Sequence, residues 1–152
     1  MQILTSLSYW LHAVATVIFI GHFVLLAFIY LPVLSKNDNG AALSEISKRS
    51  RAWMYGSLII FMITGIYLMV VDTNYMGVGN FGNAWAVVML VKHMLIIVMI
   101  ALGFWYNAIL RVGSLMSSNH PGPAIARFRT YVNTMAVCGV LVLLLTAFAQ
   151  IK

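Results

Sequence analysis

Long apolar runs alternate with short polar connections along the chain. Four runs stand out, covering residues 8–34, 53–71, 84–110 and 131–151. Each approaches or exceeds the ~20 apolar residues that an α-helix needs to cross the hydrocarbon core of a bilayer. Helices are expected for all four, because a backbone in lipid must satisfy its hydrogen bonds internally. The pattern predicts an all-α integral membrane four-helix bundle, with residues 1–152 forming a single transmembrane domain.

The connections between these runs carry residues that end helices. Pro32 stands near the end of the first run, where we expect the helix to break. Residues 73–83 and 114–123 are rich in glycine, asparagine, serine and proline, so both segments are predicted turns or loops. The composition agrees with a membrane protein: 62% of residues are hydrophobic and 8% are charged, against about 25% charged in an ordinary soluble domain. The lipid bilayer is therefore the expected partner of the outer surface.

The positive charge of the chain gathers in two of the three connections. The first connection holds Lys36, Lys48, Arg49 and Arg51, and the third lies between Arg111 and the pair Arg127 and Arg129. The middle connection has no lysine or arginine. Because basic residues near span ends stay cytoplasmic, both termini are expected outside, on the periplasmic face of a bacterial cytoplasmic (inner) membrane. The net charge of +6 is thus a topology signal, and we expect no nucleic-acid partner.

Four histidine and lysine side chains lie inside the predicted spans, where such groups mark functional sites. They are His12 and His22 in the first run, and the adjacent Lys92 and His93 in the third. No carboxylate lies in any span, which argues against a proton or cation exchanger. By depth, His12, Lys92 and His93 share the outer third of the membrane, whereas His22 lies near its middle.

These histidines are compatible with two kinds of metal chemistry. Imidazoles from two helices at similar depth can ligate a haem iron, and we expect His12, His93 and His22 as the candidate ligands. Copper is the alternative, because imidazole and thioether groups suit Cu(I) and the chain has ten methionines. The simplest alternative is that the histidines only form hydrogen bonds between helices.

Several segments resemble two related families of small membrane proteins. The segments are WLHAVATVIFIGHFVLLAFIYLPVL in the first run, the Thr64–Gly65 pair, VKHMLIIVMIALGFWYNAIL in the third run, and RFRTYVNT before the fourth. They resemble the HemJ-type protoporphyrinogen oxidases, which are four-helix haem proteins, and the copper resistance D (CopD) family.

The resemblance to the HemJ-type enzymes implies roles for particular residues. His12 would fall on the haem ligand, Lys92 on an essential lysine, Arg51 on a basic position before the second span, and Asn133 on an asparagine of the fourth. This sequence departs from that pattern, because Thr134 replaces the acidic residue that follows the asparagine. His93 is an extra histidine beside Lys92, so the set resembles a plain b-type cytochrome.

We therefore expect first a membrane-embedded protein that binds haem b and transfers electrons, with a quinone or a redox partner protein as its reaction partner. Three alternatives stay open. The protein is a copper transport or handling protein of the CopD type, an oxidoreductase of the HemJ type acting on protoporphyrinogen, or a structural subunit of a larger membrane complex. A homo-oligomer is compatible with each of them.

Overall fold

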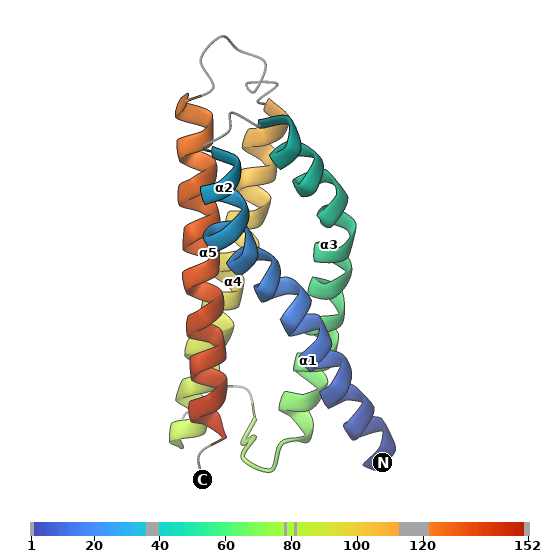
Figure 1. Cartoon of the computed structure of the whole chain (residues 1–152). Coiled ribbons are helices and arrows are strands. Elements are labelled where there is room, and N and C mark those ends of the chain that lie inside the picture. Colours follow the sequence, from blue (N-terminus) through green and yellow to red (C-terminus); the bar gives the residue numbers. More distant parts are fainter. Residues whose placement is uncertain (1, 36–39, 78, 81, 113–121, 151–152) are drawn as a thin grey trace. The chain divides into compact units, whose positions relative to one another are not determined.

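Every regular element of the described chain is helical. The computed structural model describes residues 2–35, 40–77, 79–80, 82–112 and 122–150 (Figure 1). The elements are α1 (Gln2–Leu25), the π-helix η1 (Leu26–Tyr30), α2 (Leu31–Ser35), α3 (Gly40–Val71), α4 (Ala84–Val112) and α5 (Gly122–Ala149). The all-α class predicted from the sequence is confirmed.

Four helical segments are long and apolar enough to cross a membrane. They are Gln2–Val33, Lys48–Val71, Ala84–Trp105 and Ala126–Ala149. All four predicted runs are found, so the chain is a multi-pass membrane protein. The helices differ from the runs mainly in length: α3 and α5 begin well before residues 53 and 131, because polar residues continue the helix beyond the apolar part.

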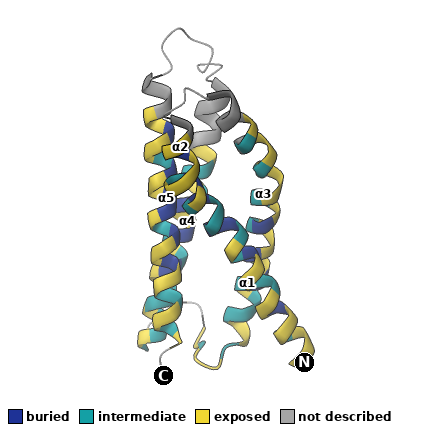
Figure 2. Ribbon diagram, viewed as in Figure 1, coloured by how far each residue is buried: buried dark blue, intermediate teal, exposed yellow. Residues whose placement is uncertain are grey.

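Many large apolar side chains on these helices are exposed. Val17, Phe28, Ile63 and Phe104 are each more than 60% exposed, and exposed residues run along the long helices in Figure 2. In water such surfaces would drive aggregation. In a bilayer they contact lipid tails as apolar as themselves, so this exposure is what a membrane-spanning helix requires.

The chain divides into two compact units, Met1–Asn83 and Ala84–Lys152. In the first unit α1 and α3 lie side by side (Figure 1). Phe19 of α1 and Phe61 of α3 are both buried, and their rings stack with centroids 6.4 Å apart. This aromatic contact lies between the polar contacts of the two helices described below.

The first span does not break at Pro32, contrary to the sequence-based expectation. Proline lacks an N–H group, and its ring would collide with the carbonyl group four residues earlier in an α-helix, here that of Phe28. The turn before Pro32 is instead widened into the π-helix Leu26–Tyr30, where the N–H of Leu31 donates to the carbonyl of Leu26. The helix therefore continues through the proline as α2.

Hydrogen bonds between residues close in sequence hold the start of the connection after α3. Oδ1 of Asp72 accepts hydrogen bonds from the backbone N–H of Asn74 at 2.8 Å and from its side-chain amide at 3.0 Å. Further on, Gly77 and Gly79 have φ angles of 98° and 85°, a region that favours glycine. The predicted loop is confirmed over its described residues.

The second unit pairs α4 with α5. Buried apolar side chains come from both helices: Ile96, Met99, Phe128, Val132, Met135 and Val142. Helix α5 starts at Gly122 with Pro123 in its first turn, where the missing N–H of a proline would have no helical partner anyway. Residues 114–121 of the predicted turn before α5, like Lys36, lie outside the described residues.

Candidate functional site

His12 is held by α3 through a hydrogen bond between two spans. Its Nδ1 atom lies 2.9 Å from Oγ1 of Thr64. The hydroxyl of Thr64 donates within its own helix to the carbonyl of Ile60, at 2.6 Å. The single hydroxyl proton of Thr64 is used in that hydrogen bond. Oγ1 of Thr64 therefore accepts the hydrogen bond with the ring, and Nδ1–H of His12 donates it.

This hydrogen bond selects one tautomer of a neutral His12 ring. A neutral imidazole with its proton on Nδ1 has its lone pair on Nε2. Histidines that bind metals almost always donate their other ring N–H to an oxygen acceptor in this way, which fixes both tautomer and ring orientation. In a neutral His12 ring, Nε2 is thus the atom that can bind a metal, and a ligand role for His12 stays a prediction.

An aromatic ring and a glycine complete the surroundings of His12. Its ring stacks on Phe61 with centroids 4.7 Å apart and planes inclined by 19°. On Gly65, the residue after Thr64, a Cβ atom would lie 3.1 Å from Cε1 of His12. The imidazole is therefore fixed by a hydrogen bond, a stacked ring and the absence of a side chain.

His22 contacts α3 at a different level from His12. Its Nε2 atom lies 3.3 Å from Oγ of Ser50, and its ring makes an edge contact with Phe23 at 5.5 Å. Ten residues separate the two histidines of α1, which is about 15 Å along the helix axis. One metal ion therefore does not bind both rings.

His93 repeats the ring arrangement of His12 in the second unit. Its Nδ1 atom lies 2.6 Å from the carbonyl oxygen of Met89, one turn earlier in α4. A carbonyl can only accept, so Nδ1 of His93 donates, and in a neutral ring Nε2 holds the lone pair. Lys92 is 8% exposed and lies about 100° from His93 around the helix, so the two side chains leave α4 in different directions.

The remaining predicted site residues lie at exposed positions. Arg51 is exposed on α3 and follows Ser50, the partner of His22. Asn133 and Thr134 are exposed on α5. The structure thus brings His12 together with Thr64 and Gly65 and separates His12 from His22. For Arg51 and Asn133 a cofactor-binding role stays a prediction.

Sequence reasoning missed the partners that hold the two histidines of α1. Thr64 and Gly65 were noted only as a motif, and Ser50 and Phe61 were not singled out. The sequence held a usable signal for these pairs. In two consecutive antiparallel helices, a step forward along one helix corresponds to a step back along the other, so the residue numbers of two facing residues add up to a nearly constant value. The pairs His12–Thr64 and His22–Ser50 follow that rule.

No group of three or more histidine, cysteine, aspartate or glutamate side chains that could hold a metal ion occurs among the described residues. A structural zinc site, which needs four such ligands, is thus not formed by that part of the chain. Methionine sulfurs are the other donors that suit Cu(I). Eight of the ten methionines fall in the described ranges, among them Met62 on α3 and Met89 on α4.

Comparison with known proteins supplies the family. Residues 44–149 match the model of the copper resistance protein D family, CopD. This segment covers more than half of the chain, so the chain belongs to the CopD family. Of the two families that the sequence resembles, the copper resistance family is the one confirmed. No curated protein and no solved structure matches the chain.

Proposed function

We propose that this member of the CopD family handles copper as cargo within a bacterial cytoplasmic membrane, and that Nε2 of His12 in the first unit and Nε2 of His93 in the second are each a copper ligand. The observation that carries the proposal is the shared ring arrangement. Each Nδ1 donates to a fixed oxygen, Oγ1 of Thr64 at 2.9 Å or the carbonyl of Met89 at 2.6 Å. In the neutral form of each ring, Nε2 is therefore the nitrogen that can bind a metal.

The chemistry of the spans favours Cu(I) over a divalent ion. None of the four spans contains a carboxylate, so no protein charge compensates a bound cation in the hydrocarbon region. A monovalent ion carries the smaller desolvation penalty there. Neutral imidazole and thioether groups are also the ligand types that suit copper in its reduced state.

Haem b was the cofactor expected first, and copper replaces it in the proposal. The matched family is named for copper resistance, and the described residues offer no observation that selects haem iron over copper. The quinone, the redox partner protein, the HemJ-type oxidation and the subunit role stay predictions. An absorption spectrum distinguishes the two metals, since haem b gives sharp Soret and α bands.

The proposed orientation follows the basic residues. Lys48, Arg49 and Arg51 precede the second span, and Arg127 and Arg129 stand at the start of the fourth. We propose that these ends face the cytoplasm and that both termini face the outside.

Copper content of intact cells tests the function. Cells that express the wild-type protein are compared with cells that carry the empty vector and with cells that express His12→Ala or His93→Ala, with membrane levels matched by immunoblot. We expect the wild-type protein to change cell copper and both variants to return it to the vector level. Copper content that equals the vector level with well-expressed wild-type protein would remove the proposal.

A further inference from the structure

An apolar groove of about 300 Å³ lies between α1 and α3. Its lining includes Leu11, Val14 and Ile18 of α1, and Trp53, Gly56 and Ile60 of α3. The hydroxyl of Ser57, which also lines the groove, donates to the carbonyl of Met54 at 2.9 Å. Since this polar group already has its partner, the groove suits a hydrocarbon chain.

The groove follows one face of α3, and a basic residue lies on the same face, one turn before the groove begins. Trp53, Gly56 and Ile60 are spaced at helical intervals, and Arg49 lies one turn before Trp53 on the same stripe. Arg49 is exposed. Arg51, by contrast, lies about 200° around the helix from Arg49, so it stands on the opposite face.

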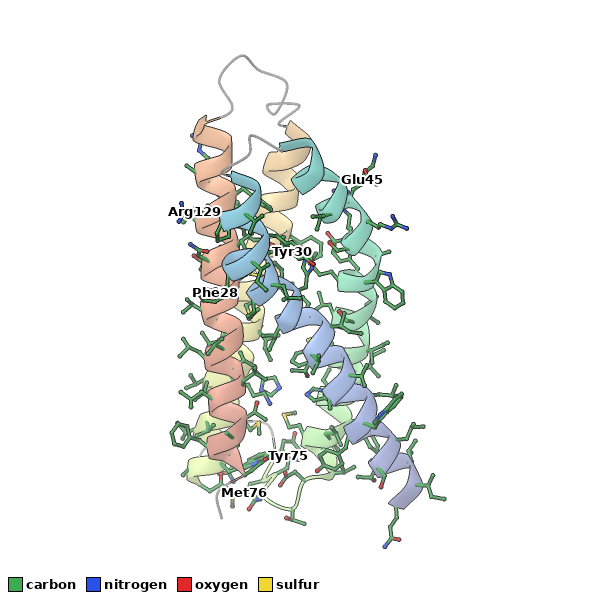
Figure 3. The ribbon with its side chains drawn as sticks, viewed as in Figure 1. Phe28, Tyr30, Glu45, Tyr75, Met76 and Arg129 are labelled. Carbon is green, nitrogen blue, oxygen red and sulfur yellow. The ribbon has the colours of Figure 1, made fainter. Side chains whose placement is uncertain are left out.

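The charge and the aromatic residue near Arg49 are typical of a segment that lies among the lipid headgroups of a membrane. Residues 45–51 hold three basic side chains against Glu45, a net charge of +2 (3 − 1). Figure 3 shows Glu45 at the end of α3 opposite to Tyr75 and Met76. Trp53 is 70% exposed and lies at the start of the apolar segment, where tryptophans anchor spans at the interface.

We propose that the groove binds one acyl chain of an anionic phospholipid whose phosphate contacts Arg49. The acyl chain lies along Trp53, Gly56 and Ile60, and Gly56 leaves room for it. A Cβ atom on Gly56 would meet no other atom within 4 Å, so this glycine faces open space in the groove. The guanidinium of Arg49 selects the lipid, because it pairs with phosphate oxygens in a charge-assisted contact.

Native mass spectrometry of the detergent-purified, delipidated protein tests this proposal with two probes, phosphatidylglycerol and phosphatidylcholine of the same acyl chains. We expect one phosphatidylglycerol per chain, bound about fivefold more tightly than phosphatidylcholine, the effect of one basic residue near a lipid surface. Arg49→Gln should abolish that preference. Arg51→Gln is the matched control on the opposite face and should retain it.

A second pair of variants tests the groove itself. Gly56→Leu fills the space without a backbone clash and should prevent binding of both lipids, whereas Gly21→Leu, also at an open position, should leave binding intact. Equal affinities for the two lipids, retained binding in Gly56→Leu, or equal effects of the two arginine variants would overturn the proposal. A quinone that displaces phosphatidylglycerol from the groove, or a lipid-free dimer, would show a different occupant and overturn it as well.

Discussion

Gly65 of α3 packs against the imidazole of His12 of α1, so that a Cβ atom on this glycine would lie 3.1 Å from Cε1 and 3.7 Å from Nδ1 of the ring. The neighbouring residue, Thr64, holds the same ring by its hydroxyl. Two consecutive residues of one span thus determine where a histidine of another span points. The position of the His12 ring is consequently sensitive to small changes in α3.

The first prediction concerns Gly65→Ala. The added methyl group is closer to Cε1 than ordinary van der Waals contact allows, so the ring must shift by a few tenths of an ångström. We expect the affinity for Cu(I) to fall about tenfold, as for other residues that orient a metal-binding histidine. Titration of the purified protein against a competing Cu(I) chelator measures this change.

Gly21→Ala is the control for that substitution, because a Cβ atom there meets nothing within 4 Å. It introduces the same methyl group into a span and should leave the copper affinity unchanged. Equal losses in the two alanine variants would show that the effect comes from the helix and not from the His12 ring.

The second prediction concerns Thr64→Val, which removes the acceptor of His12 at nearly constant volume. The Nδ1–H of the ring then lacks its partner, and the tautomer is no longer selected. We expect the copper affinity to fall about 10–100-fold, with a loss of roughly 0.6–1.7 kcal/mol in stability, the range for hydrogen bonds between membrane helices. Chelator competition and thermal unfolding in detergent measure the two effects.

Thr146→Val is the matched control in α5. Thr146 donates to the carbonyl of Val142 at 2.8 Å, one turn earlier, in the same way that Thr64 donates to Ile60. This variant lacks a comparable hydroxyl group that is not the partner of a histidine, so its copper affinity should equal that of the wild type. Unchanged copper affinity in Thr64→Val would contradict the proposed role of the His12 hydrogen bond.

The helices were predictable from the sequence because the lipid environment imposes a simple rule. A run of about 20 apolar residues must be helical when no water is present to satisfy its backbone. The ends were less predictable. Helix α3 begins at Gly40 and not near Trp53, because helical hydrogen bonding does not require apolar side chains. Pro32 was expected to end a helix, but a π-turn accommodates its ring.

The third prediction separates the two histidines of α1. Nε2 of His22 lies within hydrogen-bonding distance of Oγ of Ser50, and His22 is about 15 Å from His12 along the helix. We expect His22→Ala to retain copper, whereas His12→Ala does not. Copper analysis of both purified variants decides this, and loss of copper from both would require a site that includes His22.

The site was less predictable than the spans, because depth and rotation around each helix do not identify partners. His12 was found from the high energetic penalty of a polar group in hydrocarbon. Its hydrogen bond to Thr64 depends on how α1 and α3 are rotated against each other, and apolar residues surround each helix almost evenly. The sequence therefore offered candidate residues but not the oxygen atoms that hold them.

The fourth prediction concerns topology. Asn74 lies in the connection after α3, at the end opposite to Lys48. In a Cys138→Ser background, which removes the single cysteine, Asn74→Cys should react with a membrane-impermeant maleimide added to intact cells. Lys48→Cys should react only after the membrane is permeabilised. The reverse labelling pattern would place the basic connections outside and contradict the proposed orientation.

Metal analysis of the purified protein decides whether His12, and separately His93, binds Cu(I). Wild-type protein, His12→Ala, His93→Ala and His22→Ala are loaded with Cu(I), washed with a competing chelator and assayed for copper, and a reduced-minus-oxidised spectrum is recorded for each. We expect retained copper in the wild type and in His22→Ala, and less copper in His12→Ala and in His93→Ala. Haem b bands in the wild type together with no retained copper would contradict this expectation.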